Sequence, residues 1–282
     1  MYSKTNPTAL ALAKWYLYRL SAVCRFEFPL VSLGDSIPTA RYPYSHIPPF
    51  VHQTWSSDRF GKTHAQQLIN FRKMNPELTF LLYDDAQMYA YMDANWRSHK
   101  IYDIFRNARY AQVATDIFRY CLIYEQGGFY FDVSKGLSEP ICSFLQPQST
   151  GLITYEHRIW PTVPPSAECA AAPYRDNIVA QYGFGFAKGH PLLGAVIERI
   201  CEAYPSYKGR VFAKPKDAIL SFTGPEMFTA ALRDYRSRRH DESLVQAGVD
   251  FNGETIWKLK GAYVRFFSAP SYKHARRDAI VD

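Results

Sequence analysis

The sequence has few cysteines, and their placement excludes the structures that cysteines usually build. Only five occur among 282 residues, an odd and scattered set: Cys24, Cys121, Cys142, Cys169 and Cys201. No two of them form a Cys-x-x-Cys pair, so neither a zinc site nor a disulfide framework is indicated. We therefore expect reduced, mostly buried thiols.

Several other features are also absent. No apolar run is long enough to cross a bilayer, and no cleavable signal peptide is recognisable. The sequence contains no internal repeat, no low-complexity segment, no Gly-x-x-x-x-Gly-Lys loop and no Gly-x-Ser-x-Gly elbow. Transmembrane, repeat, P-loop and serine-hydrolase proteins are thus not expected classes.

A chain of 282 residues, 47% of them hydrophobic, can bury one large α/β core, or at most two small ones. A formal net charge of +7 favours anionic partners such as nucleotide diphosphates, acidic glycans or an anionic membrane surface. No nucleic-acid recognition motif accompanies this charge, so we expect no nucleic-acid partner. The 21 tyrosines, 19 phenylalanines and 5 tryptophans suit stacking on sugars and a nucleobase, although aromatic residues are also ordinary core material.

The most informative stretch, residues 111–138, predicts a helix, a double-glycine stop and a short strand that ends on an acid. Apolar residues with helical spacing predict one buried stripe, formed by Ala114, Ile117, Phe118, Cys121 and Leu122. Asp116 and Arg119 are expected as neighbours on the helix face away from that stripe. Gly127 and Gly128 end the helix, because glycine adopts the left-handed turn without steric cost.

Strand alternation from Phe129 to Val133 sends apolar side chains to one face and the polar set to the other: Tyr130, Asp132 and Ser134. A surface ion pair and a strand that happens to end on an acid would be a simpler explanation, and such pairs contribute only ~0.3 kcal/mol. The gathering of two acids, a base and a tyrosine around one glycine turn argues against it. A carboxylate at the end of a central strand is where a divalent cation and a diphosphate are usually bound.

One pattern resembles the signature of glycosyltransferase family 32: Asp116-x-x-Arg119-Tyr120, then Gly127-Gly128-x-Tyr130-x-Asp132. That family includes yeast Golgi initiating mannosyltransferases, bacterial capsule and lipopolysaccharide glycosyltransferases and the clostridial glucosylating toxins. The resemblance implies a GT-A-type nucleotide-diphospho-sugar transferase fold. Expected strands and helices alternate along the chain, which agrees with an α/β fold whose mostly parallel central sheet is flanked by helices. We assign residues 41–282 to this domain and residues 1–40 to an N-terminal helical extension and linker.

The resemblance also implies a divalent cation. Asp132 would hold Mn²⁺ or Mg²⁺ against the diphosphate as a Lewis acid, with Ser134 and the late His274 as further ligands. The family's metal motif is usually Asp-x-Asp, whereas this chain reads Asp132-Val133-Ser134, and a hydroxyl is a weaker, neutral ligand. Metal dependence is therefore open. No Ser-Trp follows His274 as it does in relatives, and the basic residues around it are an alternative source of positive charge.

The remaining implied roles concern the sugar-nucleotide donor. Asp116 and Arg119 would bind the sugar hydroxyls, and Tyr130 would line the donor pocket. Trp55 ends a segment that resembles the family's opening Ile-Pro…Ile-His-Gln-x-Trp strand and would lie beside the nucleobase. A lone tryptophan after a strand is more often a core residue, so this role depends on the resemblance.

Other elements follow from local patterns. We predict strands over residues 50–54, 78–83, 151–155, 177–187 and 263–267, and helices over 64–75, 86–96, 192–204 and 227–232. Asp84-Asp85 is interpreted as a helix cap rather than a metal site. Gly183 and Gly185 are interpreted as allowing close approach of a ligand. The Gly-His-Pro turn at 189–191 and the Thr-Gly-Pro turn at 223–225 are interpreted as structural.

The N-terminal residues 8–28 predict a helix with apolar residues punctuated by lysine and arginine. It either packs on the domain or contacts a membrane peripherally, where lipid-linked acceptors lie. Golgi relatives normally carry a membrane anchor, so its absence favours a bacterial cytoplasmic enzyme, in peripheral contact with the inner face of the inner membrane if the helix binds lipid.

The expected activity is transfer of a sugar from a nucleotide-sugar donor to a surface polysaccharide or lipid-linked glycan, with retention of configuration. Two alternatives stay open. A catalytically impaired sugar-nucleotide-binding protein of the same fold is favoured by Ser134 in place of the second acid. A toxin-like effector that modifies protein is disfavoured by the short chain, in which no delivery segment is recognisable.

Overall fold

The computed structural model describes residues 17, 20, 28–44, 46–159, 177–239, 241–262 and 275–282. The predicted helix at 8–28 lies almost wholly outside these residues, as do the predicted strand at 263–267 and His274. The division of the chain at residue 40 stays a prediction. Residues on both sides of it pair, since strand β1 (Leu30–Ser32) runs antiparallel to β3 (Arg59–Gly61).

A seven-stranded sheet forms the centre of the fold, in the order β11-β7-β9-β5-β2-β4 with β8 beside β7. Its strands are β2 (Phe50–Thr54), β4 (Thr79–Tyr83), β5 (Gly128–Phe131), β7 (Gly151–Ile159), β8 (Asn177–Val179), β9 (Gly183–Phe186) and β11 (Leu244–Val249). Strands β4, β2, β5, β7 and β11 run in one direction, whereas β8 and β9 run against them. The predicted α/β fold with a mostly parallel sheet flanked by helices is confirmed.

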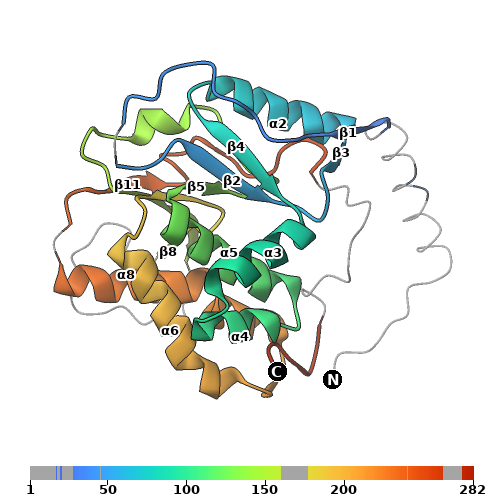
Figure 1. Ribbon diagram of the computed structural model, residues 1–282, viewed down its shortest axis with the longest axis vertical. Helices are drawn as coiled ribbons and strands as arrows, with labels where there is room; N and C mark the ends of the chain where they lie inside the picture. Colours follow the sequence, from blue (N-terminus) through green and yellow to red (C-terminus); the bar gives the residue numbers. More distant parts are fainter. Residues whose placement is uncertain are drawn as a thin grey trace.

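Helices cover both faces of this sheet (Figure 1). Helix α2 (Lys62–Met74) lies on one face. The other carries α3 (Asp85–Trp96), α4 (Lys100–Arg106), α5 (Ala111–Gln126), α6 (Pro191–Tyr207) and α8 (Pro225–Arg238), and α7 (Pro215–Phe222) contacts α6 and α8. Smaller elements complete the fold: β6 (Gly136–Leu137) pairs with β12 (Thr255–Ile256), β10 (Val211–Phe212) pairs with β13 (Asp278–Ala279), and Ile141–Phe144 form a 3-10 helix.

Helix α5 occupies the middle of the helical layer, and this position corrects the prediction for its polar residues. The structure buries it from Val113 to Ile123 on nearly every side, with Asp116 at 6% exposure and Arg119 at 7%. The expected solvent-facing side is therefore wrong, because segments distant in sequence contact these two residues: Gln181 contacts Arg119 and Thr223 contacts Asp116. The glycine stop is confirmed: Gly127 has φ 72°, and a Cβ there would lie 2.7 Å from Cδ of Pro48.

The alternation in β5 is confirmed by the two cores on either side of the sheet. Tyr130 belongs to the core under α5 and α6, whereas Phe129 and Phe131 belong to the core on the opposite face. Each of these three side chains is at most 1% exposed. Burial of both faces explains why β5 consists almost entirely of aromatic residues.

The glycines of β9 accommodate phenylalanines rather than a ligand, which corrects a second prediction. Gly185 pairs with Phe129, and a Cβ on it would lie 2.3 Å from a ring carbon of Phe129. Gly183 is likewise opposite Phe131, at 2.8 Å. The predicted single strand over 177–187 is also interrupted, because β8 and β9 pair with different parts of β7.

Most predicted helices and caps are confirmed, with boundaries that differ by a few residues. Asp84 caps α3 in a reciprocal arrangement with Gln87, and Nδ1 of His190 accepts a hydrogen bond from the first turn of α6. Helices α4 and α7 are additions that the sequence patterns did not predict. In the described part of the chain, no helix is both long and apolar enough to cross a membrane.

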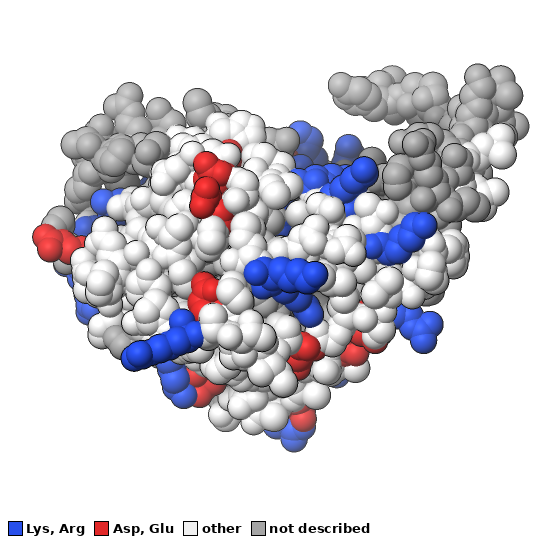
Figure 2. Space-filling model, turned by 90° about the horizontal axis from the view of Figure 1, so that it is seen from above, with Lys and Arg blue, Asp and Glu red and all other residues white. Residues whose placement is uncertain are grey.

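The charges on the face seen over α2 are mixed. Figure 2 shows lysine and arginine side chains interspersed with acidic ones across a larger uncharged area. The net positive charge of the chain therefore does not gather into one continuous basic surface on the described part of this face.

Candidate active site

The candidate site lies where neighbouring parallel strands β2 and β5 end. From β2 the chain continues through α2 to β4 on one side, and from β5 it continues to β7 and β9 on the other. Ligands of open α/β sheets bind at such a switch point, outside the carboxyl ends of the strands. Thr54 and Trp55 lie at the end of β2, and Asp132 follows the end of β5.

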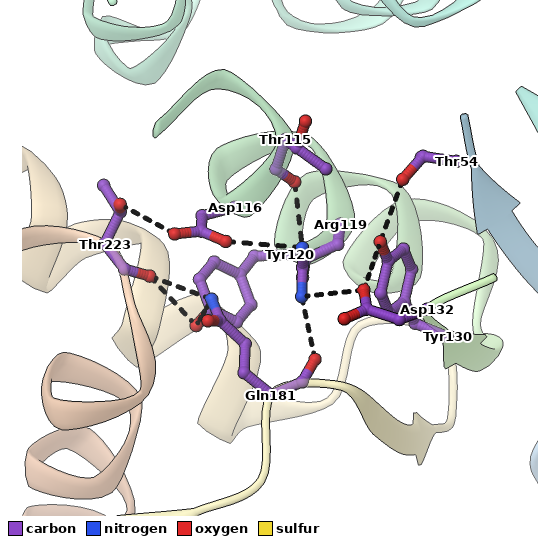
Figure 3. A network of polar contacts seen from close by, with 9 residues as sticks. All are labelled: Thr54, Thr115, Asp116, Arg119, Tyr120, Tyr130, Asp132, Gln181 and Thr223. Carbon is purple, nitrogen blue, oxygen red and sulfur yellow. Dashed lines mark hydrogen bonds and ion pairs between the residues drawn. The ribbon is translucent and has the colours of Figure 1, made fainter. Parts of the chain in front are cut away.

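Arg119 is the centre of a buried polar network at this point (Figure 3). Its Nη1 donates to the carbonyl oxygen of Gln181 at 2.8 Å and lies 3.6 Å from Oδ1 of Asp132. Its Nη2 lies 3.4 Å from Oδ1 of Asp116. The guanidinium carbon is also 4.4 Å from the ring centroid of Tyr130, a cation–π distance.

The pKa of Arg119 reflects these contacts. Burial lowers it, but the combined effect of Tyr130, Asp132, Asp116 and Tyr120 outweighs burial and leaves the pKa above its ordinary value. Arg119 is therefore a permanently charged group on the protein side of the site, beneath Asp132.

Tyr130 holds the partly exposed Asp132 on the side opposite Arg119. Its hydroxyl donates to Oδ1 of Asp132 at 3.2 Å and lies 2.9 Å from the hydroxyl of Thr54. The two strand ends are thereby linked through one phenol. The backbone amide of Asp132 donates to the carbonyl oxygen of Tyr182 at 2.8 Å, which holds the acid in place after the strand has ended.

Asp116 is the buried acid of the network. Its Oδ2 accepts a hydrogen bond from the hydroxyl of Thr223 at 3.1 Å. Burial raises its pKa to about 7, although Arg119 and the Thr223 hydroxyl act in the opposite direction. Asp116 and Arg119 each expose 9% of their side chains and Asp132 exposes 35%, so contact with a ligand falls mainly on Asp132.

A second layer of contacts supports Asp116 and was not predicted. The amide nitrogen of Gln181 donates to the hydroxyl of Tyr120 at 2.7 Å and to the carbonyl oxygen of Thr223 at 3.1 Å. Tyr120 also donates to that carbonyl, at 3.2 Å. The Thr-Gly-Pro turn does begin helix α8, as predicted, but Thr223 also belongs to the site. Gln181 lies in a loop, and no sequence pattern marks it.

Trp55 lies at the same edge of the sheet, partly exposed. Its ring stacks on Phe60 at 6.1 Å between centroids and meets the edge of His64 at 6.2 Å. Its position after β2 suits the predicted contact with a nucleobase, which stays a prediction. His52, by contrast, is fully buried against the carbonyl oxygen of Gly127, and burial lowers its pKa to about 4, in agreement with a structural role.

Two of the three predicted metal ligands, Asp132 and Ser134, lie within the described residues. The contacts of the Asp132 carboxylate with Tyr130 and Arg119 both fall on Oδ1, and Ser134 is partly exposed two residues later. No group of three or more His, Cys, Asp or Glu side chains capable of holding a metal occurs among the described residues, and His274 is outside them. One carboxylate and one hydroxyl fit Mg²⁺ or Mn²⁺ only if diphosphate oxygens complete the coordination, as is common for Mg²⁺.

Comparison with known proteins shows that part of this domain is similar to glycosyltransferases. Residues 61–151 match the family described as "Glycosyltransferase sugar-binding region containing DXD motif". This range includes Asp116, Arg119, Tyr130 and Asp132. The resemblance to glycosyltransferase family 32 that the sequence predicted is thereby confirmed.

Particular relatives are yeast proteins. The chain is 24% identical over 235 residues to the initiation-specific alpha-1,6-mannosyltransferase of Schizosaccharomyces pombe, covering 79% of this chain and 55% of the relative. It is 26% identical over 236 residues to the putative glycosyltransferase HOC1 of Saccharomyces cerevisiae, covering 77% and 55%. It is also 26% identical over 156 residues to inositol phosphoceramide mannosyltransferase 3 of S. pombe, covering 55% and 37%.

The chain thus spans about half the length of these relatives, or less. Among solved structures, the PaToxG glycosyltransferase superposes with a TM-score of 0.48 at 14% identity, over 79% of this chain and 76% of that one.

Proposed function

We propose that this protein is a glycosyltransferase that moves a sugar from a nucleotide-sugar donor to a glycan or lipid-linked glycan. The observation that supports this most strongly is Asp132: a partly exposed carboxylate at the switch point of the sheet, held by Tyr130 and backed by Arg119. The similarity of residues 61–151 to sugar-binding regions of this class supports the same activity.

The site is suited to the departure of a nucleoside diphosphate. Negative charge develops on the diphosphate as the bond to the sugar breaks, and a fixed positive environment lowers the barrier. A divalent cation bound by Asp132 and Ser134 would supply that charge as a Lewis acid. Arg119 orients Asp132, since its guanidinium is 3.6 Å from Oδ1.

We assign the remaining predicted roles in the same way. Asp116 and Arg119 bind the sugar hydroxyls through the small part of each side chain that is exposed, and Trp55 lies beside the nucleobase. Tyr130 is 1% exposed, so instead of lining the pocket it acts on it through its hydroxyl, which donates to Asp132. His274 contributes to the diphosphate or metal site. The acceptor hydroxyl attacks from the face that the diphosphate leaves, so that the configuration of the sugar is retained.

The acceptor we propose is a growing surface polysaccharide, such as capsule or lipopolysaccharide, or its lipid-linked precursor. The net charge of +7 favours an acidic glycan or an anionic membrane surface. We place the reaction in the cytoplasm, at the inner face of a bacterial inner membrane.

The experiment is a panel of nucleotide sugars, each with Mn²⁺, with Mg²⁺ and with EDTA, followed by donor hydrolysis and thermal shift. We expect hydrolysis of one donor that requires the cation and is abolished in Asp132→Ala with the melting temperature nearly unchanged. Asp103→Ala, at an exposed acid outside the site, is the matched control.

Three results would change the proposal. A thermal shift without turnover of any donor would favour a sugar-nucleotide-binding protein impaired by Ser134. Full activity in EDTA would exclude the metal from the reaction. Near-normal hydrolysis by Asp132→Ala would refute the assignment of the site.

A further inference from the structure

A second group of polar and aromatic side chains lies at the same edge of the sheet, beyond Asp132. Strands β7 and β11 run parallel to β5, so the segments that follow Tyr155 and Val249 emerge at this edge. His157 lies on the first segment and Asp250 on the second, where Tyr155 and Val249 are register partners. Neither Asp250 nor His157 belongs to the network around Arg119.

The two residues form a carboxylate–imidazole pair. Nδ1 of His157 is 3.1 Å from Oδ2 of Asp250. The Asp250 side chain is 10% exposed and the His157 side chain 58%, so the acid is an internal support and the imidazole is presented outward. With Nδ1 held by the carboxylate, Nε2 is the ring nitrogen directed away from it.

Tyr182 joins this pair to the proposed donor site. Its hydroxyl is 3.3 Å from Oδ1 of Asp250 and 2.9 Å from the hydroxyl of Thr255. Its carbonyl oxygen accepts the hydrogen bond from the amide of Asp132. A single tyrosine residue therefore spans the space between Asp250 and Asp132.

Trp257 adds an aromatic wall next to His157. The two ring centroids are 5.1 Å apart with an edge-on angle of 86°. Lys135 places its ammonium 4.1 Å from the Trp257 ring centroid and donates to the Trp257 carbonyl oxygen at 2.6 Å. Tyr182 packs on the same indole at 5.3 Å. The partly exposed indole is thus held rigidly in one orientation.

The backbone that carries Asp250 is held in an unusual conformation. Asp250, Phe251 and Asn252 have φ angles of 50°, 53° and 59°, the left-handed region that side chains rarely occupy in succession. The turn is fixed from below by Thr154, whose hydroxyl accepts from the amide of Phe251 at 2.7 Å. Such conformations persist where surrounding contacts determine them, and they cluster at ligand sites.

Two properties decide what this group can bind. The partly exposed Trp257 indole and the exposed His157 imidazole offer aromatic surface on which the C–H groups of a sugar ring can pack. The imidazole Nε2 offers a hydrogen bond to a hydroxyl beside that contact. The group also lies on the side of Asp132 away from Trp55, where the nucleobase is assigned.

We propose that His157 and Trp257 form the acceptor subsite for a hexopyranose ring, with Asp250 as a positioning residue that fixes the imidazole. This inference rests on the proposed glycosyl transfer, since it assigns the second substrate of that reaction. The sugar packs on Trp257 and His157, and one of its hydroxyls bonds to Nε2.

The test separates the two substrates. With the donor found in the panel above, donor hydrolysis is measured without acceptor, and transfer is measured against a series of p-nitrophenyl hexopyranosides. In His157→Ala and Trp257→Ala we expect hydrolysis within about twofold of wild type and an acceptor KM raised about tenfold, which corresponds to ~1.4 kcal/mol. His46→Ala, at an exposed histidine near the opposite end of β2, is the matched control and should leave both unchanged.

The role of Asp250 has its own readout. Asn tolerates the left-handed conformation, so Asp250→Asn should fold and raise the acceptor KM severalfold. It should also change the ¹⁵N shifts of the His157 ring, because the carboxylate no longer selects the tautomer. Unchanged ring shifts would refute the positioning role.

A binding measurement keeps the inference testable if no donor is turned over. Saturation-transfer NMR with the same hexopyranosides should show saturation of the sugar ring protons by wild type and by His46→Ala, and a severalfold weaker effect with His157→Ala and Trp257→Ala. Absence of hydrolysis with this binding intact would refute the proposed function alone. Equal acceptor binding in all variants, equal losses of hydrolysis and transfer, or no hexopyranoside bound by wild type would overturn the acceptor subsite.

Discussion

Replacement of Asp116 by asparagine should change how stability depends on pH. Burial raises the pKa of this carboxyl from 3.8 to about 7. In the unfolded chain the group ionises near its ordinary value, so between these two pKa values the folded protein holds a proton that the unfolded chain does not. The free energy of unfolding therefore decreases as pH rises through this range and levels off above the folded pKa. Asp116→Asn cannot ionise and lacks this contribution.

The magnitude follows from the size of the shift. Each pKa unit corresponds to about 1.36 kcal/mol. Between about pH 5 and the folded pKa of about 7, the folded protein keeps the Asp116 proton, and the unfolded chain does not, across about two pH units. From about pH 5 to about pH 8, wild type should thus lose about 3 kcal/mol more of its unfolding free energy than Asp116→Asn does. The hydrogen bond to Thr223 and the charge of Arg119 also differ in the variant, but those effects shift its stability at both pH values and largely cancel in the comparison.

The assay is urea unfolding at the two pH values, followed by fluorescence. Asp103→Asn makes the same chemical change at an exposed position in helix α4 and should track wild type at both. Equal pH dependence of wild type and Asp116→Asn would refute the reasoning. It would mean that Arg119, 3.4 Å away, keeps Asp116 ionised at both pH values in spite of burial.

Three further changes test contacts of the site and the sheet. Thr223→Val removes the hydroxyl that donates to Asp116 Oδ2, and we expect a loss of about 1–2 kcal/mol at about pH 8 and a further rise in the pKa of Asp116, visible as an extended pH slope in urea unfolding. Arg119→Lys replaces a buried guanidinium that reaches two acids and a carbonyl with a single ammonium, and both donor turnover and stability should fall, the latter by about 2–3 kcal/mol. Gly185→Ala places a methyl group 2.3 Å from the Phe129 ring, and calorimetry should show a loss of about 1–3 kcal/mol.

Each of these changes has a matched control in the chain. Thr39→Val alters an exposed threonine and should leave the pH slope unchanged. Arg97→Lys alters an exposed arginine paired with Asp93 and should shift stability by less than about 0.5 kcal/mol. Gly34→Ala adds a methyl group with no neighbour within 4 Å and should be neutral. If any of the three test variants behaves like its control, the contact assigned to that residue is contradicted.

The sequence by itself determined the local elements and the composition of the site. The helix of residues 111–126, the glycine stop and the alternation of Phe129, Tyr130 and Phe131 depend on period and on glycine conformation, which neighbours in sequence decide. The position of Asp132 after a central strand, and the cap at Asp84, are likewise local. These features also carried the resemblance to glycosyltransferases.

Only the tertiary structure decided how those residues are used. Asp116 and Arg119 are buried because distant segments cover the helix face that the apolar pattern left for solvent: Gln181 and Thr223 reach them from 62 and 107 positions away in sequence. Gly185 accommodates Phe129 for the same reason: strand pairing, which no local pattern specifies, sets them opposite each other. Pairing and burial depend on contacts between distant segments, so they emerge only when the chain has folded.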